Sequence, residues 1–133
     1  MTRDAQRQAV RERAEKRCEY CHLPDVLPQT LRFQLEHVLA RQHGGATTFE
    51  NLAWCCQRCN EKKGPNLSGV DPDTSIIVSL FHPRHDRWQD HFALAGLTIA
   101  GLTPVGRATA WLLDMNSEER LRWRAALQRY GLF

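Results

Sequence analysis

Two Cys-x2-Cys pairs constrain the fold of this 133-residue chain more than any other feature. Cys18 and Cys21 form the first pair, and Cys56 and Cys59 form the second. Each pair can present two thiolates from one tight turn, and two such turns complete a tetrahedral set of four sulfurs around Zn²⁺. The segment between the pairs is long enough to contain a β-hairpin. We therefore predict a structural zinc site made of these four cysteines, with a fold that depends on the ion.

Two other interpretations of the cysteines are weaker. A redox-active pair needs a thioredoxin-like βαβ pattern around it, and neither pair has one. Cys55 could replace Cys56 as a ligand, but the two-residue spacing favours Cys56 and leaves Cys55 among apolar neighbours. The first 17 residues are charged throughout, unlike a secretory signal peptide. Grouped cysteines without such a signal are typical of a reducing compartment, so we predict a cytoplasmic location.

The composition excludes several classes of protein. An apolar fraction of 42% and a charged fraction of 25% are ordinary for a globular domain, which excludes collagen-like, coiled-coil and wholly disordered chains. No apolar run approaches the roughly 20 residues of a membrane-spanning helix, so we expect no membrane association. The net charge of +3 permits a polyanionic partner without demanding one.

The order of the expected elements indicates an α+β fold. Hydrophobic spacing predicts a helix over residues 2–17, and the alternation of Leu31, Phe33 and Leu35 predicts a half-buried strand that ends at Glu36-His37. A strand over residues 51–54 and a helix over 57–63 follow. Pro, Gly, Ser and Asp in residues 66–73 indicate a linker. The remaining expectations are strands at 76–81 and within 92–102, a helix from Thr103-Pro104 to Asp114, and a helix from Asn116 to Tyr130.

Four polar residues between and just after the cysteine pairs suggest chemistry on phosphodiesters: Glu36, His37, Asn51 and Asn60. Hydrolysis of a phosphodiester needs a general base with a pKa near neutrality, and histidine is the natural one. It also needs a hard cation that neutralises the leaving oxygen, and carboxylate and amide oxygens suit Mg²⁺ or Mn²⁺.

The sequence resembles the HNH endonuclease family with its zinc knuckles. Five segments carry the resemblance: residues 18–21, 33–38, 44–47, 51–54 and 56–64. The tail around residues 80–92 and 101–109 is similar to the C-terminal extension of small bacterial HNH proteins. The resemblance implies a ββα-metal (His-Me finger) core over residues 1–65, with an N-terminal helix and a four-cysteine zinc site. Residues 66–133 would then be an α/β extension packed on that core.

The resemblance also implies a role for each polar residue. His37 would be the general base that deprotonates the attacking water, and Asn51 would hold the loop after the first strand so that His37 keeps its orientation. Asn60 would bind the catalytic Mg²⁺ or Mn²⁺, and Glu36 would stand where the family usually has an aspartate ligand. The longer Glu36 is a departure that bears on metal preference and rate. The implied reaction is in-line attack on phosphorus that leaves 5′-phosphate and 3′-hydroxyl ends.

Further residues are candidates for contacts with DNA, the expected partner. Arg41 and Lys63 could touch phosphates, although each could equally be a solvated charge. His43 could contact a phosphate or a base, but its position before Gly44-Gly45 favours a loop histidine without such a contact. The histidines of the tail, at positions 82, 85 and 91, could form a second metal site, but their spacing favours local hydrogen bonds. The alternative function is a zinc-ribbon module that binds nucleic acid and lacks catalysis. A single site per chain fits nicking, or double-strand cutting by a dimer, and the sequence leaves the oligomeric state open.

Overall fold

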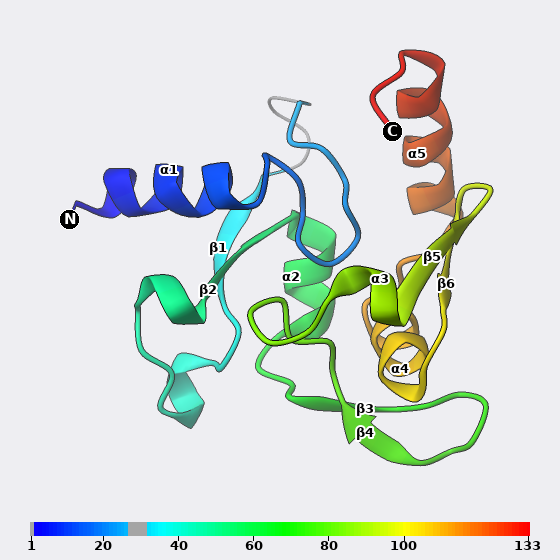
Figure 1. Ribbon diagram of the computed structural model, residues 1–133, viewed down its shortest axis with the longest axis horizontal. Helices are drawn as coiled ribbons and strands as arrows, with labels where there is room; N and C mark the ends of the chain where they lie inside the picture. The colour runs from blue at the N-terminus through cyan, green and yellow to red at the C-terminus, as the bar shows by residue number, and fades with distance from the viewer. Residues whose placement is uncertain (1, 27–31) are drawn as a thin grey trace. The chain divides into compact units, whose positions relative to one another are not determined.

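The computed structural model describes residues 2–26 and 32–133, and the chain divides into two compact units, Met1–Pro65 and Asn66–Phe133 (Figure 1). Both units contain helices and strands. In the described part of the chain, the strands form three separate two-stranded sheets, and every pairing is antiparallel. The α+β class predicted from the sequence is therefore confirmed.

The N-terminal helix α1 spans Arg3–Arg13 and is shorter than predicted. Thr2 caps it, because the Thr2 hydroxyl accepts a hydrogen bond from the backbone N–H of Ala5 at 3.1 Å. The chain leaves the helix before residue 17 because Glu15 and Lys16 adopt left-handed backbone angles, with φ of 56° and 59°. Hydrophobic spacing alone does not reveal such a turn at residues other than glycine or asparagine.

A hairpin and a short helix form the centre of the N-terminal unit. Strand β1 (Gln34–His37) pairs with β2 (Leu52–Cys55) so that His37 lies opposite Leu52. Helix α2 (Gln57–Lys63) begins immediately after β2 and packs on β1 (Figure 1). The connection between the strands contains two 3₁₀ turns, η1 (Arg41–His43) and η2 (Phe49–Asn51). Leu31, which the sequence placed in the first strand, lies outside the described residues.

The burial of β1 differs from the prediction of a strand with one solvated polar face. Glu36 is only 4% exposed, whereas Leu35 on the other face is half-buried. Side chains alternate between the faces of a strand, so Gln34 and Glu36 share one face and Leu35 and His37 share the other. The face with Gln34 and Glu36 is covered because α2 packs against it.

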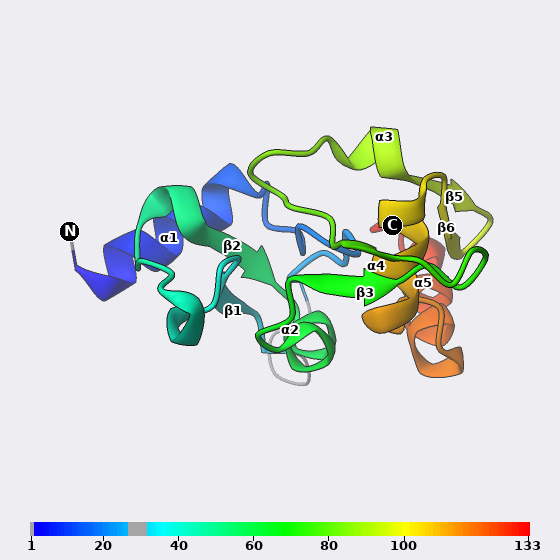
Figure 2. The same cartoon turned by 90° about the horizontal axis from the view of Figure 1, so that it is seen from below.

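The C-terminal unit is built around helix α4 (Pro104–Leu112), which contacts strand β6 and the hairpin of β3 and β4 (Figure 2). The other elements of this unit are β3 (Ser68–Val70), β4 (Ile77–Ser79), α3 (Trp88–His91), β5 (Phe92–Ala95), β6 (Thr98–Gly101) and α5 (Glu118–Arg129).

Three expectations for the C-terminal unit need correction. The segment interpreted as a linker contains β3, because Gly69 lets the strand approach Leu80 and Ala108 closely. The short helix α3 was not predicted. Helix α5 begins after Ser117, whose hydroxyl accepts from the N–H of Arg120, so Ser117 and not Asn116 is the N-cap.

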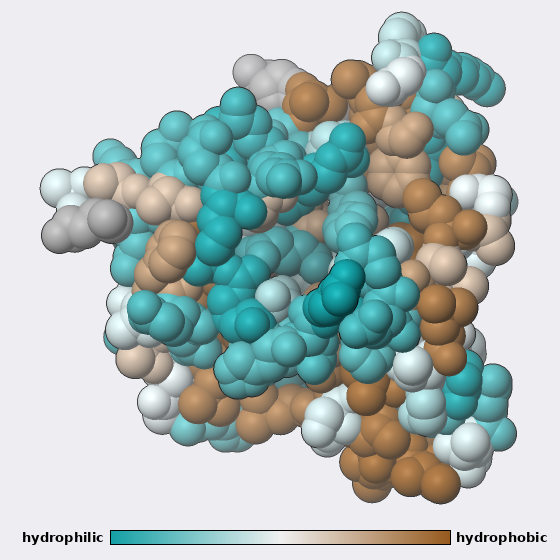
Figure 3. Space-filling model, in the orientation of Figure 1, coloured by the Kyte–Doolittle hydropathy of each residue, from teal (hydrophilic) through white to brown (hydrophobic). Residues whose placement is uncertain are grey.

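The surface of the β3–β4 hairpin is apolar (Figure 3). Val70, Ile76 and Ile77 are 49%, 60% and 71% exposed. None of the helices in residues 2–26 and 32–133 has the length and apolar character needed to cross a membrane.

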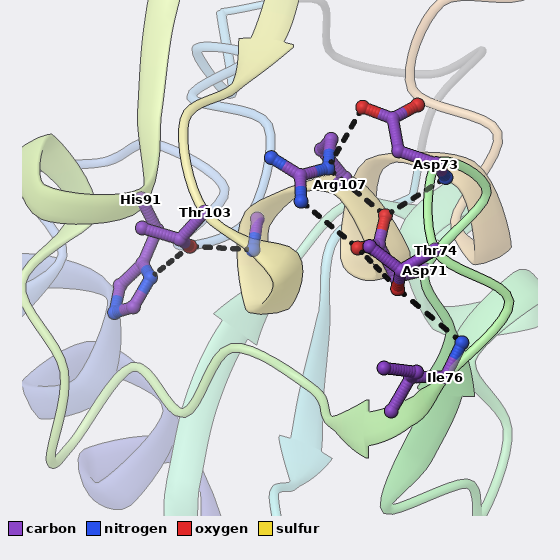
Figure 4. A network of polar contacts seen from close by, with 8 residues as sticks. Asp71, Asp73, Thr74, Ile76, His91, Thr103 and Arg107 are labelled. Atoms are coloured by element: carbon purple, nitrogen blue, oxygen red, sulfur yellow. Dashed lines mark hydrogen bonds and ion pairs between the residues drawn. The ribbon is translucent and has the colours of Figure 1, made fainter.

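A buried carboxylate ties β3 to α4 (Figure 4). Asp71 is fully buried and accepts two hydrogen bonds from the Arg107 guanidinium, both at 2.9 Å. The Thr74 hydroxyl donates a further bond to Asp71 at 2.9 Å. Asp73, whose side chain is 66% exposed, also pairs with Arg107. The hydrogen bonds from Arg107, together with those from Asp73 N–H and Thr74, hold the pKa of Asp71 well below its ordinary value of 3.8.

We expect the Asp71–Arg107 pair to make the stability of the C-terminal unit depend on pH. A carboxyl with a depressed folded-state pKa stabilises the fold above its unfolded pKa of about 3.9, and this contribution is lost as the pH falls through the folded pKa. Asp71→Asn should therefore lower the unfolding temperature at pH 7, and the difference from wild type should narrow below about pH 4.

Tryptophan fluorescence in a Trp54→Phe background measures this effect, because the three remaining tryptophans all lie in the C-terminal unit. Asp73→Asn is the matched control, since its exposed carboxylate should contribute far less. If the unfolding temperatures of wild type and Asp71→Asn differed by the same amount from pH 7 down to pH 2, the proposed link between the ionisation of Asp71 and stability would be wrong.

Candidate active site

The four predicted cysteines gather in one buried cluster. Their Sγ atoms all lie within 4.8 Å of one another, and Cys21 Sγ is 3.7 Å from Cys56 Sγ. Zn–S bonds of about 2.3 Å in a tetrahedron give sulfur–sulfur edges of about 3.8 Å. Within residues 2–26 and 32–133, these are the only His, Cys, Asp or Glu side chains that form a group of three or more able to share an ion. The geometry is that of a structural zinc site.

The cysteines of the cluster are reduced, as ligands of a metal cation must be. None of the five cysteines forms a disulfide. Burial, followed by the neighbouring thiol of Cys18, raises the pKa of Cys59 well above its ordinary value of 9.0. A bound cation reverses this effect because it stabilises thiolates. Cys55 is buried beside the cluster but outside the set of four, as the two-residue spacing predicted.

The residues inside the first Cys-x2-Cys turn connect the cluster to the hairpin. Glu19 exchanges two hydrogen bonds with Trp54 of β2: its N–H donates to the Trp54 carbonyl, and its carboxylate accepts from the Trp54 N–H, both at 2.8 Å. The Tyr20 hydroxyl, from a fully buried side chain, donates to Glu36 Oε2 at 2.8 Å. The zinc turn is therefore hydrogen-bonded to both strands.

Glu36 forms a buried ion pair with the last residue of α2. Its Oε1 lies 2.6 Å from Lys63 Nζ, and both side chains are less than 5% exposed. The same ammonium donates to the backbone carbonyl of Val38 at 3.1 Å. Burial raises the pKa of Glu36, and the charge and hydrogen bond of Lys63 oppose that shift. The carboxylate thus has a cationic partner in Lys63 and a hydroxyl partner in Tyr20.

Asn60 lies on the same face of α2 as Lys63, because residues three apart on a helix are neighbours. Its amide nitrogen donates to the side-chain oxygen of Gln34 on β1. Asn60 and Glu36 therefore both lie at the interface between α2 and β1, where Asn60 contacts Gln34 and Glu36 contacts Lys63. A carboxylate and an amide oxygen there form a donor set that suits a hard divalent cation, and a cation that uses Glu36 has to share it with Lys63 or displace the ammonium.

His37 is the last residue of β1 and lies on the opposite face from Glu36. Its Nε2 is 2.8 Å from the Thr47 hydroxyl in the connection between the strands. Partial burial, and then the positive charge of Arg41, lowers the pKa of His37 below its ordinary value of 6.5. The imidazole is therefore largely neutral at pH 7, which is the form that a general base requires.

Asn51 organises the connection beside His37. Its side-chain oxygen accepts from Leu39 N–H at 2.9 Å, and its amide nitrogen donates to the carbonyls of Leu39 and Ala46 at 3.0 and 2.9 Å. Gly45 allows this arrangement, because a Cβ there would lie 1.7 Å from the Leu39 carbonyl oxygen. One amide thus closes the loop that follows the strand of His37.

We expect Asn51→Ala to loosen this loop without unfolding the protein. The variant loses three hydrogen bonds at an exposed site where water replaces the lost partners, so the free energy of unfolding should fall by about 1–2 kcal/mol. The amide of Leu39 should exchange its hydrogen faster, which mass spectrometry or NMR measures. Asn51→Asp keeps the acceptor for Leu39 N–H and serves as the control. Unchanged exchange at Leu39 in the alanine variant would refute the loop-closing role.

The three residues proposed to touch DNA have different surroundings. Arg41 and His43 are exposed in the connection next to His37. Lys63 is only 2% exposed and its ammonium is engaged by Glu36 and Val38, so the prediction that it contacts phosphates needs correction. Its position at the end of a basic helix suggested a solvated charge, and only the packing of α2 on β1 shows otherwise.

The histidines of the tail make local contacts, as their spacing favoured. The rings of His82 and His85 stack with centroids 3.9 Å apart, and His91 Nδ1 lies 2.6 Å from the Thr103 hydroxyl. They form no metal-binding group in the part of the chain that the structure describes.

Comparison with known proteins agrees with this geometry. Residues 18–66 match the model of the HNH endonuclease family, a range that contains all four cysteines together with Glu36, His37, Asn51 and Asn60. This segment is similar to the HNH endonuclease family, whose name implies nuclease activity and action on nucleic acid.

One curated relative extends the likeness into the tail. The chain is 25% identical over 115 residues to the Septu protein PtuB of Bacillus thuringiensis, a match that covers 85% of this chain. The chain spans only 42% of the length of that relative. No solved structure matches the chain.

Proposed function

We propose that the protein is a metal-dependent endonuclease that hydrolyses phosphodiester bonds of DNA, with a ββα-metal core formed by β1, β2 and α2. The observation that carries this proposal is the position of His37. A largely neutral imidazole ends β1, within an HNH-family segment whose hairpin and helix are joined by the four-cysteine cluster.

His37 is the general base in this proposal. In this proposal Nε2–H donates to the Thr47 hydroxyl, which leaves Nδ1 as the nitrogen that accepts a proton from the attacking water. The water oxygen forms a bond to phosphorus while the bond to the 3′-oxygen breaks, which leaves a 5′-phosphate and a 3′-hydroxyl. Asn51 keeps the loop closed beside the imidazole.

Glu36 and Asn60 are the residues that would hold the catalytic Mg²⁺ or Mn²⁺. Because Glu36 and His37 leave β1 on opposite faces, the proposal requires the scissile phosphate to lie at the end of β1, where both side chains can reach it. When bound, such an ion supplies charge stabilisation at the departing oxygen. The four cysteines would hold a separate Zn²⁺ whose role is structural. Arg41 and His43, exposed beside His37, are the residues we propose to contact the DNA backbone. A cytoplasmic location stays a prediction.

Relaxation of supercoiled plasmid tests the proposed function. Zinc-loaded protein should nick the plasmid when Mg²⁺ or Mn²⁺ is added. A low concentration of EDTA should stop cleavage while the zinc content and circular dichroism stay unchanged, because the oxygen-bound ion is held more weakly than the sulfur-bound one. Folded, zinc-loaded protein that binds DNA but never cleaves it with either ion would reject the nuclease and favour the alternative of a binding module without catalysis.

A further inference from the structure

We propose that Lys63 is the positioning residue of the site and that it acts on His37 from both sides along the chain. The expected effects on cleavage kinetics rest on the proposed function, whereas the expected effect on the position of His37 does not. A single ammonium group contacts the carboxylate of Glu36, the residue before His37, and the backbone carbonyl of Val38, the residue after it.

The contacts of Lys63 are buried and short. Its Nζ lies 2.6 Å from Glu36 Oε1 and 3.1 Å from the Val38 oxygen, and the side chain is 2% exposed. Val38 is itself buried, and its N–H donates to the Asn51 carbonyl at 2.9 Å. The end of β1 is therefore held by Lys63 on one side and by Asn51 on the other, and His37 is the residue between the held positions.

Lys63 also links the zinc cluster to this strand end. It is the last residue of α2, whose first turn contains the ligand candidate Cys59 and whose N-cap is Cys56. Glu36 receives a second contact from Tyr20 of the first cysteine turn. The first cysteine turn thus contributes Tyr20 to the Glu36 carboxylate, and the helix that begins in the second cysteine turn contributes Lys63. A cluster fixed by its ion therefore also fixes the end of the strand that carries His37.

The variant that tests this role is Lys63→Met, which keeps the length of the side chain and removes the ammonium. The NMR measurement uses protein that contains zinc but no added Mg²⁺ or Mn²⁺, and His37→Ala assigns the imidazole signals of His37. In Lys63→Met these signals should shift or broaden relative to wild type. The kcat for plasmid nicking should fall at least tenfold, with KM for DNA within twofold of wild type. Lys62→Met is the matched control, because Lys62 is the exposed neighbour on the same turn, and it should leave both readouts unchanged.

A second variant covers a failure to fold, since Lys63→Met leaves a buried carboxylate without its cation. Glu36→Gln combined with Lys63→Met removes both charges while Val38 still loses its donor, so the His37 signals should again be displaced. Wild-type His37 signals in this folded double variant would overturn the proposal, as would a rise in KM with unchanged kcat in Lys63→Met. If the variants displace the His37 signals but wild-type protein does not cleave DNA, the positioning role of Lys63 is supported and the proposed nuclease function is rejected.

Discussion

His37→Ala should reduce plasmid nicking by about 10²–10⁴-fold, the range that a general base contributes to a hydrolysis. The imidazole is half-buried and makes one side-chain hydrogen bond, to Thr47, so its loss should leave the fold and the zinc content intact. The lowered pKa of His37 keeps the base neutral in wild type at pH 7. Single-turnover rates with saturating Mn²⁺, measured for variant and wild type, give the ratio directly.

The matched control is His85→Ala, because His85 is an exposed histidine of the C-terminal unit. It should nick plasmid at the wild-type rate, which separates the loss of a specific base from the loss of any histidine. Nicking by His37→Ala within threefold of wild type would remove His37 from the reaction and leave the site without its base.

The parts of the site that the sequence predicted well are those with local causes. The two-residue spacing of each cysteine pair closes a turn by itself, so the cluster of four sulfurs could be predicted without knowledge of the rest of the chain. Helix α2 was predicted at its observed bounds because Gly64-Pro65 ends it locally. The roles of the polar residues of the HNH segment were predicted by resemblance to the family. Such a resemblance identifies positions in the sequence but does not predict which side chains are in contact.

The contacts of Glu36 and Lys63 could not be predicted, because they depend on how separate elements pack. Gln34 and Glu36 alternate with apolar residues and so indicate a solvated strand face. The structure covers that face with α2 and neutralises Glu36 with Lys63. A usable signal was present: the basic end of the helix after the second cysteine pair can reach a carboxylate in the strand, and Tyr20 lies within the first cysteine turn.

Removal of the zinc should unfold the N-terminal unit. The apparent free energy of zinc binding in small modules is about 10–16 kcal/mol, which matches or exceeds the whole stability of a typical domain, about 5–15 kcal/mol. Cys59→Ser should therefore lose the ion, and the amides of Val38 and Trp54 should lose their protection from hydrogen exchange. The C-terminal unit contains no cysteine, so its amides should stay protected. Metal analysis and exchange mass spectrometry on the full chain measure both effects.

Cys55→Ser is the control that makes this prediction specific. Cys55 is as buried as the four clustered cysteines and adjoins one of them, so a general sensitivity of the interior to a hydroxyl group would appear in both variants. The serine at position 55 should retain one zinc per chain and the wild-type exchange pattern. If Cys55→Ser loses the ion while Cys56→Ser keeps it, the ligand set is wrong. The link from the second cysteine turn through α2 to Lys63 and Glu36 would then start from a different sulfur.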